Sequence, residues 1–228
     1  MPAQRIIAGV DEAGRGSVIG PLVVAGVSIE KSKEKQLRKL GVKDSKLLTA
    51  KQRERLAVKI EKLAKDIIVI RTDPCKIDTY RKQGVDLNWL EAMKFTDAMN
   101  FLAPHEAYID SFSVNTKRVK KLLEKMVRHE VAMTVEHEAD LNYPIVSAAS
   151  IIAKVERDRE VAELRKKYGP FGSGYPSDST TIQFLEQWFE QHKQYPECVR
   201  TTWFTAEDIA NNSLQQRLGN WFKSFSKK

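Results

Sequence analysis

Residues 6–16 of the chain, IIAGVDEAGRG, join an apolar run to two adjacent carboxylates and then to a glycine-arginine-glycine loop. The β-branched and small residues of the run predict a buried strand. Asp11 and Glu12 follow at its end, where their like charges repel each other and burial disfavours both. We therefore expect a positive charge to be bound at this end of the strand.

Two kinds of site place a glycine-rich loop after a strand. The first is a phosphate-binding loop, but this stretch fits neither GxGxxG nor GxxxxGK[ST], and its two carboxylates would repel a phosphate that had no cation with it. The second is a divalent-metal site, which fits better because clustered carboxylate oxygens suit Mg²⁺ or Mn²⁺. A metal site predicts further carboxylates at similar strand or helix ends.

Two further carboxylates occupy such positions. Residues 106–111, EAYIDS, predict a short strand that ends in Asp110, the same design as the first strand. If the two strands are parallel neighbours, their acids emerge at one edge of the sheet. Asp140 precedes a helix expected from Pro144, where an acid alone could simply favour the helix N-terminus by about 0.3–1 kcal/mol. The predicted metal site has four acids: Asp11, Glu12, Asp110 and Asp140.

The remaining chain predicts alternating strands and helices. Apolar or β-branched segments predict strands at residues 5–11, 20–29, 66–71, 106–110 and 131–136. Helical spacing predicts helices at residues 86–102, 119–127, 144–168, 178–193 and 205–224, and one more in which Leu56, Ile60, Leu63 and Ile67 follow a cap at Thr49. This order predicts an α/β fold with a mixed β-sheet covered by helices.

Length and composition are those of a globular protein with one core, or one core and a small appendage. Of the 228 residues, 42% are hydrophobic and 30% are charged. The apolar runs are too short for a membrane span, and no signal-peptide core is present. Cys75 and Cys198 are too few for a disulfide framework. We predict a soluble, cytoplasmic, monomeric protein with no membrane partner.

Positive charge is concentrated in one part of the chain. The net charge is +8, and residues 31–66 hold thirteen Lys and Arg against five Asp and Glu, so the remainder is neutral as a whole. Such a stretch suits a polyanion such as nucleic acid, but a solvated pair of lysine-rich helices would look the same. Lys154 and Arg157, one turn apart on the helix from residue 144, leave a similar choice between phosphate contacts and pairing with neighbouring acids.

Five blocks of the sequence stand in the order of one known family: GVDEAGRGSVIGPLVVAGV (9–27), KDSK (43–46), YIDS (108–111), EADLNYPIVSAASIIAKVERD (138–158) and GSGYPSD (172–178). Together they resemble ribonuclease HII of the archaeal kind, over residues 5 to 180. The resemblance implies a ribonuclease-H-like mixed β-sheet flanked by helices, with a helical C-terminal extension. We expect a catalytic domain at residues 1–200 and the extension at residues 201–228.

The resemblance also implies roles for matching residues. Asp11, Glu12, Asp110 and Asp140 fall on the four catalytic acids, which hold two divalent ions, Mg²⁺ or Mn²⁺. Six further positions match substrate contacts of the family: Gly14, Arg15, Gly16, Ser45, Lys46 and Tyr175. The glycine-arginine-glycine motif senses the ribose 2′-hydroxyl, the tyrosine packs against the following deoxyribose, and the serine and lysine help to hold the nucleic-acid backbone.

The expected activity is that of an endoribonuclease acting on RNA–DNA hybrids and RNA–DNA junction duplexes. It would cut on the 5′ side of a ribonucleotide and leave 3′-hydroxyl and 5′-phosphate ends, with roles in RNA primer removal and ribonucleotide excision repair. One alternative is a non-catalytic hybrid-binding protein, but four acids would weaken plain binding of a polyanion. Another is a different metal-dependent nuclease or integrase of the same fold, against which the glycine-arginine-glycine loop and Tyr175 argue.

A last motif lies near the C-terminus. Residues 215–222, QQRLGNWF, match the box with which proteins bind PCNA-type sliding clamps. Its key positions are Gln215, Leu218, Trp221 and Phe222. One tight helical turn would bring the apolar members onto one side as a plug for a hydrophobic pocket. An amphipathic terminal helix that packs on the protein's own core would use the same spacing, so both interpretations stay open.

Overall fold

A computed structural model of the protein describes residues 5–42 and 48–225, and on the last helix it describes side chains only up to residue 213 and at Gln215. The chain forms two compact units. The sheet unit comprises Met1–Arg15, Leu22–Thr72 and Val85–Arg159, and the helical unit comprises Gly16–Pro21, Asp73–Gly84 and Glu160–Lys228. The domain boundary expected at residue 200 follows a different division and stays a prediction.

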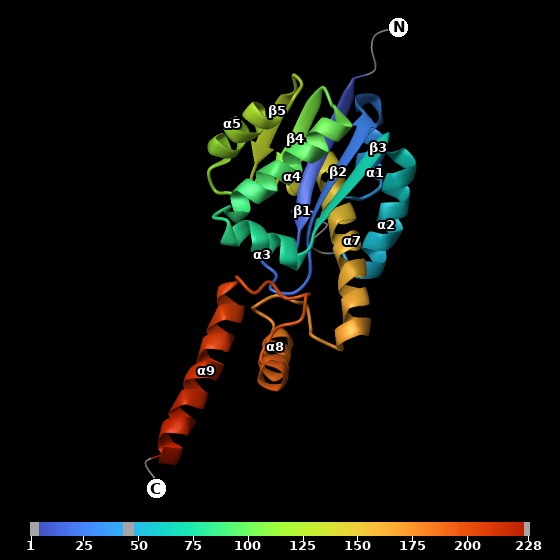
Figure 1. Cartoon of the computed structure of the whole chain (residues 1–228). Helices are drawn as coiled ribbons and strands as arrows, with labels where there is room; N and C mark the ends of the chain where they lie inside the picture. The colour runs from blue at the N-terminus through green and yellow to red at the C-terminus, as the bar shows by residue number, and fades with distance from the viewer. Residues whose placement is uncertain (1–4, 43–47, 226–228) are drawn as a thin grey trace. The chain divides into compact units, whose positions relative to one another are not determined.

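The sheet unit is built on one five-stranded mixed sheet in the order β3-β2-β1-β4-β5 (Figure 1). The strands are β1 (Ile6–Ala13), β2 (Leu22–Glu30), β3 (Asp66–Thr72), β4 (Glu106–Asp110) and β5 (Ala132–Glu136). β2 is antiparallel to both β1 and β3, whereas β1, β4 and β5 are parallel. All five predicted strands are confirmed, and so is the mixed sheet.

Helices connect the strands and make up most of the helical unit. They are the 3₁₀-helix η1 (Lys31–Lys33), α1 (Glu34–Lys39), α2 (Ala50–Leu63), α3 (Pro74–Lys82), α4 (Leu87–Leu102), α5 (Thr116–Met126), α6 (Ala139–Asn142), α7 (Pro144–Tyr168), α8 (Ser179–His192) and α9 (Phe204–Phe225). Those predicted from residues 86, 119, 144, 178 and 205 are confirmed. Among the described helices, none is both long and apolar enough to cross a membrane.

The helices α2 and α3 differ from the prediction. α2 begins after Thr49, whose side chain forms the expected cap as part of a capping box with Gln52, but the helix ends at Leu63. Placing Ile67 on this helix was therefore wrong: it lies in β3 opposite Val27, where a β-branched side chain suits the sheet. The sequence also did not predict α3, whose apolar stripe is too short to show helical spacing.

Helices cover both faces of the sheet, so apolar side chains fill both faces. Along β2, Val23 packs in a cluster with α2 and α7, whereas the next residue, Val24, packs in a second cluster with α4 and α5. β1 and α7 approach so closely that a Cβ on Gly9 would overlap the backbone of Ile145. This contact fixes β1, and the acids at its end, against the first turn of α7.

The helical unit has a core of its own. Phe171 and Leu185 are fully buried in its apolar cluster. The buried Asp78 carboxylate on α3 accepts hydrogen bonds from the backbone and the hydroxyl of both Thr201 and Thr202, at 2.6–3.2 Å. Because a buried carboxylate is costly without such donors, these bonds tie α3 firmly to the segment before α9.

Candidate active site

The acids predicted at two strand ends lie together at one edge of the sheet. β1 and β4 are parallel neighbours with Val10 opposite Ile109, so the next residues, Asp11 and Asp110, lie side by side where the pairing of these two strands ends. β1 itself continues to Ala13, paired with β2. Asp11 is buried, and the adjacent Glu12 is half-buried. The strand arrangement on which the metal-site prediction depended is therefore confirmed.

Burial and like charge act together on these carboxylates. Burial raises the pKa of Asp11 to about 7, the charge of Asp110 adds to the rise, and the charge of Lys154 and a hydrogen bond with Ser150 oppose it. The pKa of Glu12 is also raised well above its usual value, first by burial and then by the charge of Asp11. Three carboxylates therefore repel one another in a site that favours a bound cation.

The fourth acid, Asp140, lies on the one-turn helix α6 and not at the start of α7, as its position before Pro144 had suggested. Its side chain is buried. The backbone N–H of the preceding residue, Ala139, donates a 3.1 Å hydrogen bond to Oδ1 of Asp110. The segment that carries Asp140 therefore contacts the end of β4 directly.

The chemistry of this donor set fits a divalent cation, because carboxylate oxygens are the ligands that Mg²⁺ and Mn²⁺ prefer. Oε2 of Glu12 is buried and has no hydrogen-bond partner among the described residues, an arrangement that is costly unless a cation approaches. Within residues 5–42 and 48–225, no three His, Cys, Asp or Glu side chains are already arranged around a common metal position. Binding would therefore require these side chains to adjust.

The arginine of the glycine-arginine-glycine loop is anchored by α4. Arg15 Nε lies 2.9 Å from Oε1 of Glu91 and donates to its Oε2 at 3.0 Å, and Nη2 donates to Oδ1 of Asn88. The Glu91 side chain is fully buried. Its negative charge also raises the pKa of Glu12. Glu91 was not predicted, although the sequence held a signal: it lies four residues before the buried Phe95 on an otherwise apolar helical stripe.

Lys154 is a second unexpected participant. Its Nζ donates a hydrogen bond to Oγ of Ser150 one turn earlier on α7, and its charge lowers the pKa of Asp11. The sequence left open whether Lys154 contacts phosphate or pairs with neighbouring acids of its own helix. In the structure, the charge of Lys154 acts on Asp11 of β1. The two residues come together because α7 packs on β1, which the sequence alone does not show.

Two of the predicted substrate contacts, Gly16 and Tyr175, belong to the helical unit. The loop residue Tyr175 is half-buried. The adjacent Gly174 carbonyl accepts hydrogen bonds from the backbone of Val18 and Ile19, at 2.8 and 3.1 Å. Within this unit the tyrosine loop is therefore bonded to the segment that begins at Gly16. Ser45 and Lys46 lie outside the described residues, so their predicted role stays a prediction.

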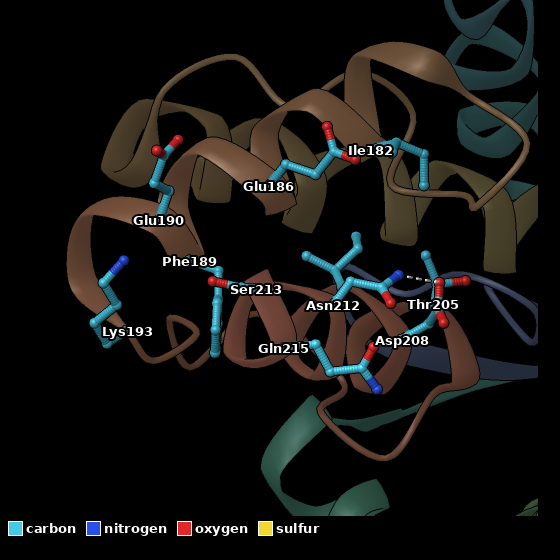
Figure 2. A pocket seen from close by; sticks show the side chains of 11 residues that line it. Ile182, Glu186, Phe189, Glu190, Lys193, Thr205, Asp208, Asn212, Ser213 and Gln215 are labelled. Carbon is cyan, nitrogen blue, oxygen red and sulfur yellow. Dashed lines mark hydrogen bonds between the residues drawn. The ribbon is translucent and has the colours of Figure 1, made fainter. Parts of the chain in front are cut away.

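The residues of the clamp-binding motif lie on α9. Gln215 is exposed and lines a groove of about 740 Å³ between α8 and α9, together with side chains such as Glu186, Phe189 and Asp208 (Figure 2). The side chains of the other three predicted members lie outside the described part of the structure: Leu218, Trp221 and Phe222. The motif itself thus stays a prediction.

Comparison with known proteins decides the family. The model of the family described as Ribonuclease HII matches residues 8–206. The chain belongs to the ribonuclease HII family. It is 46% identical to the ribonuclease HII of Pyrococcus horikoshii over 214 residues, which are 93% of this chain and 96% of that one. The predicted resemblance is confirmed, and with it the class of enzyme, a metal-dependent type 2 ribonuclease H.

Solved structures of ribonucleases H share this fold. Ribonuclease H2 from P. horikoshii OT3 superposes with a TM-score of 0.86 at 47% identity, covering 91% of this chain and 98% of that one. The ribonuclease HII in a PCNA complex from Archaeoglobus fulgidus gives 0.82 at 44% identity, covering 89% and 96%. A Bst-RNase HIII bound to Mn²⁺ gives 0.78 at 20% identity, covering 92% and 70%, which supports the fold alone. The expected ribonuclease-H-like fold is confirmed.

Proposed function

We propose that this ribonuclease HII hydrolyses the RNA strand of RNA–DNA hybrids and cuts on the 5′ side of ribonucleotides embedded in duplex DNA. Family membership supports the ribonuclease H activity. The observation that carries the proposed site is the group of carboxylates where β1 and β4 meet, in which burial and repulsion by neighbouring carboxylates raise the pKa values of Asp11 and Glu12. Such a group suits divalent cations, which metal-dependent phosphodiester hydrolysis uses to activate water and to stabilise charge on the phosphate.

The proposed mechanism assigns one task to each group. Two divalent ions, Mg²⁺ or Mn²⁺, would supply an activated water and stabilise charge on the phosphate when bound. The ligands would be the four acids Asp11, Glu12, Asp110 and Asp140. Lys154 keeps a fixed positive charge beside Asp11 and so limits repulsion within the site. Breaking the bond from phosphorus to the 3′ oxygen of the preceding nucleotide leaves a 3′-hydroxyl, and the 5′-phosphate stays on the ribonucleotide.

Substrate choice is assigned to the loop after β1 and to Tyr175. Gly14 has φ +83°, and among the described residues nothing beyond the chain neighbours lies within 4 Å of the position that a Cβ on Gly16 would take, so the backbone here can approach a sugar closely. Backbone groups of this loop would pair with the 2′-hydroxyl, which distinguishes ribose from deoxyribose. Arg15 is anchored to Glu91 and therefore holds the loop in place. The ring of Tyr175 would pack on the deoxyribose that follows.

A sliding clamp is the proposed protein partner. The 44% identical enzyme from A. fulgidus has been solved in complex with PCNA, and this chain carries a matching motif at Gln215, Leu218, Trp221 and Phe222. Clamp binding would bring the enzyme to newly made DNA, where RNA primers and misincorporated ribonucleotides occur. We accordingly propose roles in primer removal and in ribonucleotide excision repair, carried out in the cytoplasm.

The proposed activity is tested with a DNA duplex that carries one ribonucleotide. With Mg²⁺ we expect a single cut on the 5′ side of the ribonucleotide, with a 3′-hydroxyl that a polymerase can extend; EDTA should abolish the cut. An all-DNA duplex of the same sequence serves as the control and should stay intact. Cleavage on the 3′ side, cleavage of the all-DNA duplex, or full activity in EDTA would each contradict the proposal.

A further inference from the structure

The one-turn helix α6 cannot hold itself in place. It has only four residues, Ala139–Asn142, and so short a helix has no stability of its own because nucleation is unfavourable. Glu138, just before it, has the left-handed conformation with φ +53°. Yet α6 carries the buried Asp140, whose carboxylate must be placed accurately if it is to share a cation with the strand-end acids. The surrounding contacts must therefore fix this helix.

Two strand-end carboxylates bracket α6. At its start, Ala139 N–H donates to Oδ1 of Asp110 at 3.1 Å. At its end, Asn142 Nδ2 donates to Oε2 of Glu136 at 3.3 Å, and the hydroxyl of the next residue, Tyr143, donates to Oε1 of Glu136 at 2.8 Å. Asp110 and Glu136 are direct partners in the register of the parallel strands β4 and β5. The two carboxylates therefore form a rigid base that holds both ends of the helix.

Glu136 has a different task from the four predicted acids. Both of its carboxylate oxygens accept hydrogen bonds from the segment that ends α6, so its charge is directed to that segment. The bond from the Tyr143 hydroxyl is 2.8 Å long and joins a donor to a carboxylate, and it is the main cause of the raised pKa of that hydroxyl. Glu136 thus lies next to a proposed metal ligand in the sheet while binding protein donors itself.

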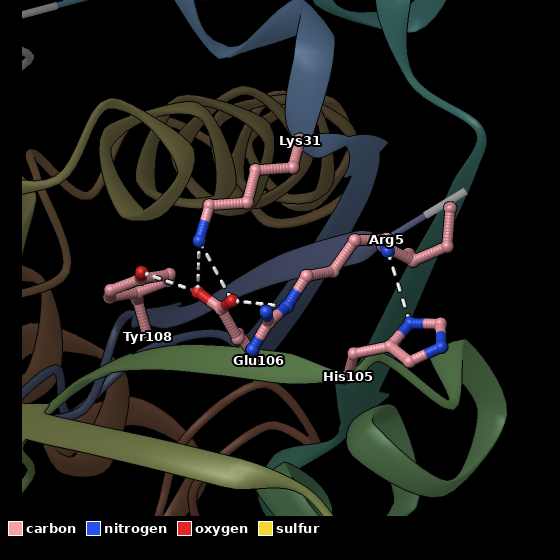
Figure 3. Close-up of polar contacts among 6 residues, drawn as sticks. Arg5, Lys31, His105, Glu106 and Tyr108 are labelled. Carbon is pink, nitrogen blue, oxygen red and sulfur yellow. Dashed lines mark hydrogen bonds and ion pairs between the residues drawn. The ribbon is translucent and has the colours of Figure 1, made fainter. Parts of the chain in front are cut away.

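The ring of Tyr143 is held as well as its hydroxyl. It packs against the ring of Tyr108 at an interplanar angle of 32°, with centroids 4.6 Å apart. The Tyr108 hydroxyl donates to Oε2 of Glu106, and Lys31 Nζ and Arg5 Nε lie 2.8 and 2.6 Å from the same carboxylate (Figure 3). This pair of packed rings therefore joins the end of α6 to a charged cluster at the start of β4. The two tyrosines contact each other through their rings, but their hydroxyls donate to different residues, Glu136 for Tyr143 and Glu106 for Tyr108.

We propose that Glu136 and Tyr143 are positioning residues that hold Asp140 for divalent-metal binding. The inference rests on the proposed role of Asp140 as a metal ligand. Without the bond from Tyr143 to Glu136, the end of α6 is no longer held on β5. The Asp140 carboxylate is then fixed in position only when metal binds, and part of the binding free energy is lost in fixing it. Because a site that is not preorganised binds more weakly, the affinity for metal falls while the chemistry at saturating metal is retained.

The test compares Tyr143→Phe with the matched control Tyr108→Phe, each of which removes one hydroxyl and keeps the contact between the two rings. Mn²⁺ binding to the full-length protein without substrate is measured by electron paramagnetic resonance. We expect the Kd of Tyr143→Phe to rise by roughly 3- to 10-fold, as for the loss of one hydrogen bond. Its backbone amide exchange over residues 139–143 should also become faster. Tyr108→Phe should match the wild type in both measurements.

A second variant pair keeps the proposal falsifiable if one substitution disturbs folding. Glu136→Gln retains one acceptor oxygen and should weaken Mn²⁺ binding less than Glu136→Ala does. Cleavage by Tyr143→Phe should recover to near the wild-type rate at high Mg²⁺. An unchanged Kd in folded Tyr143→Phe, or an equal loss in Tyr108→Phe, would overturn the inference. If Asp140→Asn itself binds Mn²⁺ normally, the proposed ligand role fails instead, so the two failures are distinguishable.

Discussion

Asp11, a proposed metal ligand, shows how a single buried acid can destabilise the metal-free fold. Its pKa rises to about 7 because burial disfavours the charged form and Asp110 repels it, although Lys154 lowers the pKa. A proton is one way to relieve this repulsion, and a divalent cation is the other. The residues proposed to bind metal should therefore make the stability of the metal-free protein sensitive to pH.

We expect the metal-free protein to lose stability as pH rises from about 4 to 7. The pKa of Asp11 is higher in the folded state than its ordinary value of 3.8, so the stabilisation is fully present below the unfolded pKa and disappears as pH rises through the folded one. Urea unfolding in EDTA at pH 5 and pH 8 should differ by on the order of 1–3 kcal/mol more in the wild type than in Asp11→Asn. Equal pH dependence in both proteins would show that Asp11 ionises normally.

Replacing one proposed ligand should separate catalysis from folding. Asp110→Asn and Asp140→Asn should each lower the cleavage rate by at least about 100-fold, because each removes charge that holds metal. Both proteins should remain folded by circular dichroism, since removing one of several repelling charges does not weaken the core. Asp97→Asn, at an exposed acid on α4, is the control and should retain activity. Substantial Mg²⁺-dependent activity in folded Asp110→Asn would contradict the assignment.

At the scale of elements, the predictions succeeded where a pattern is local. The five strands follow from β-branched runs, and the cap at Thr49 was legible in the sequence. α6 was missed because four residues show no periodicity, and its position depends on Asp110 and Glu136 from two separate strands. Glu91 was missed because a helical stripe identifies buried positions but not the partner, Arg15, that makes a buried acid tolerable.

A further prediction concerns the glycines of the loop after β1, because the space around each glycine decides which substitution tests the loop without disturbing the fold. Gly16→Ala should reduce cleavage at a single ribonucleotide by about tenfold or more while duplex binding stays near the wild-type value, because basic residues still supply the electrostatic attraction. Within residues 5–42 and 48–225, no heavy atom beyond its chain neighbours lies within 4 Å of the new Cβ, so the fold should be unaffected. Cleavage and binding are measured on the same labelled duplex. A proportional fall in both would identify the loop as a general contact.

Gly9→Ala serves as the contrasting variant for this experiment. Its Cβ would overlap the backbone of Ile145, so the strand and α7 would have to separate. We expect loss of stability and of activity together. Gly14 is less suitable for the comparison, since its φ of +83° makes any side chain strained regardless of substrate.

At the scale of the whole molecule, the sequence alone could not predict that the acids lie close together; it predicted this only on the condition that their strands are parallel neighbours. Asp11 and Asp110 are 99 positions apart, and they meet only because β1 and β4 are parallel neighbours. No local pattern specifies which strands are neighbours, whereas the order of five motif blocks pointed to a family whose fold brings them together. The function of the basic stretch was likewise ambiguous from the sequence. In the structure, Arg53 of this stretch forms a 2.8 Å ion pair with Asp158, so at least this positive charge pairs within the protein.

The C-terminal motif gives a prediction about the molecule and its partner. The full-length double variant Trp221→Ala with Phe222→Ala should lose binding to a PCNA-type clamp, because it removes the apolar plug of the motif. Mg²⁺-dependent cleavage without the clamp should stay within about twofold of the wild type, since the proposed acids lie in the sheet unit. Phe204→Ala, at an exposed aromatic on the same helix, is the matched control and should bind the clamp normally. Calorimetric titration with the clamp measures binding. Because Gln215 is exposed, a partner can reach this part of the motif.

Two outcomes would contradict the prediction. If the double variant unfolds, or if it binds the clamp as the wild type does, these aromatics pack on the protein's own core instead.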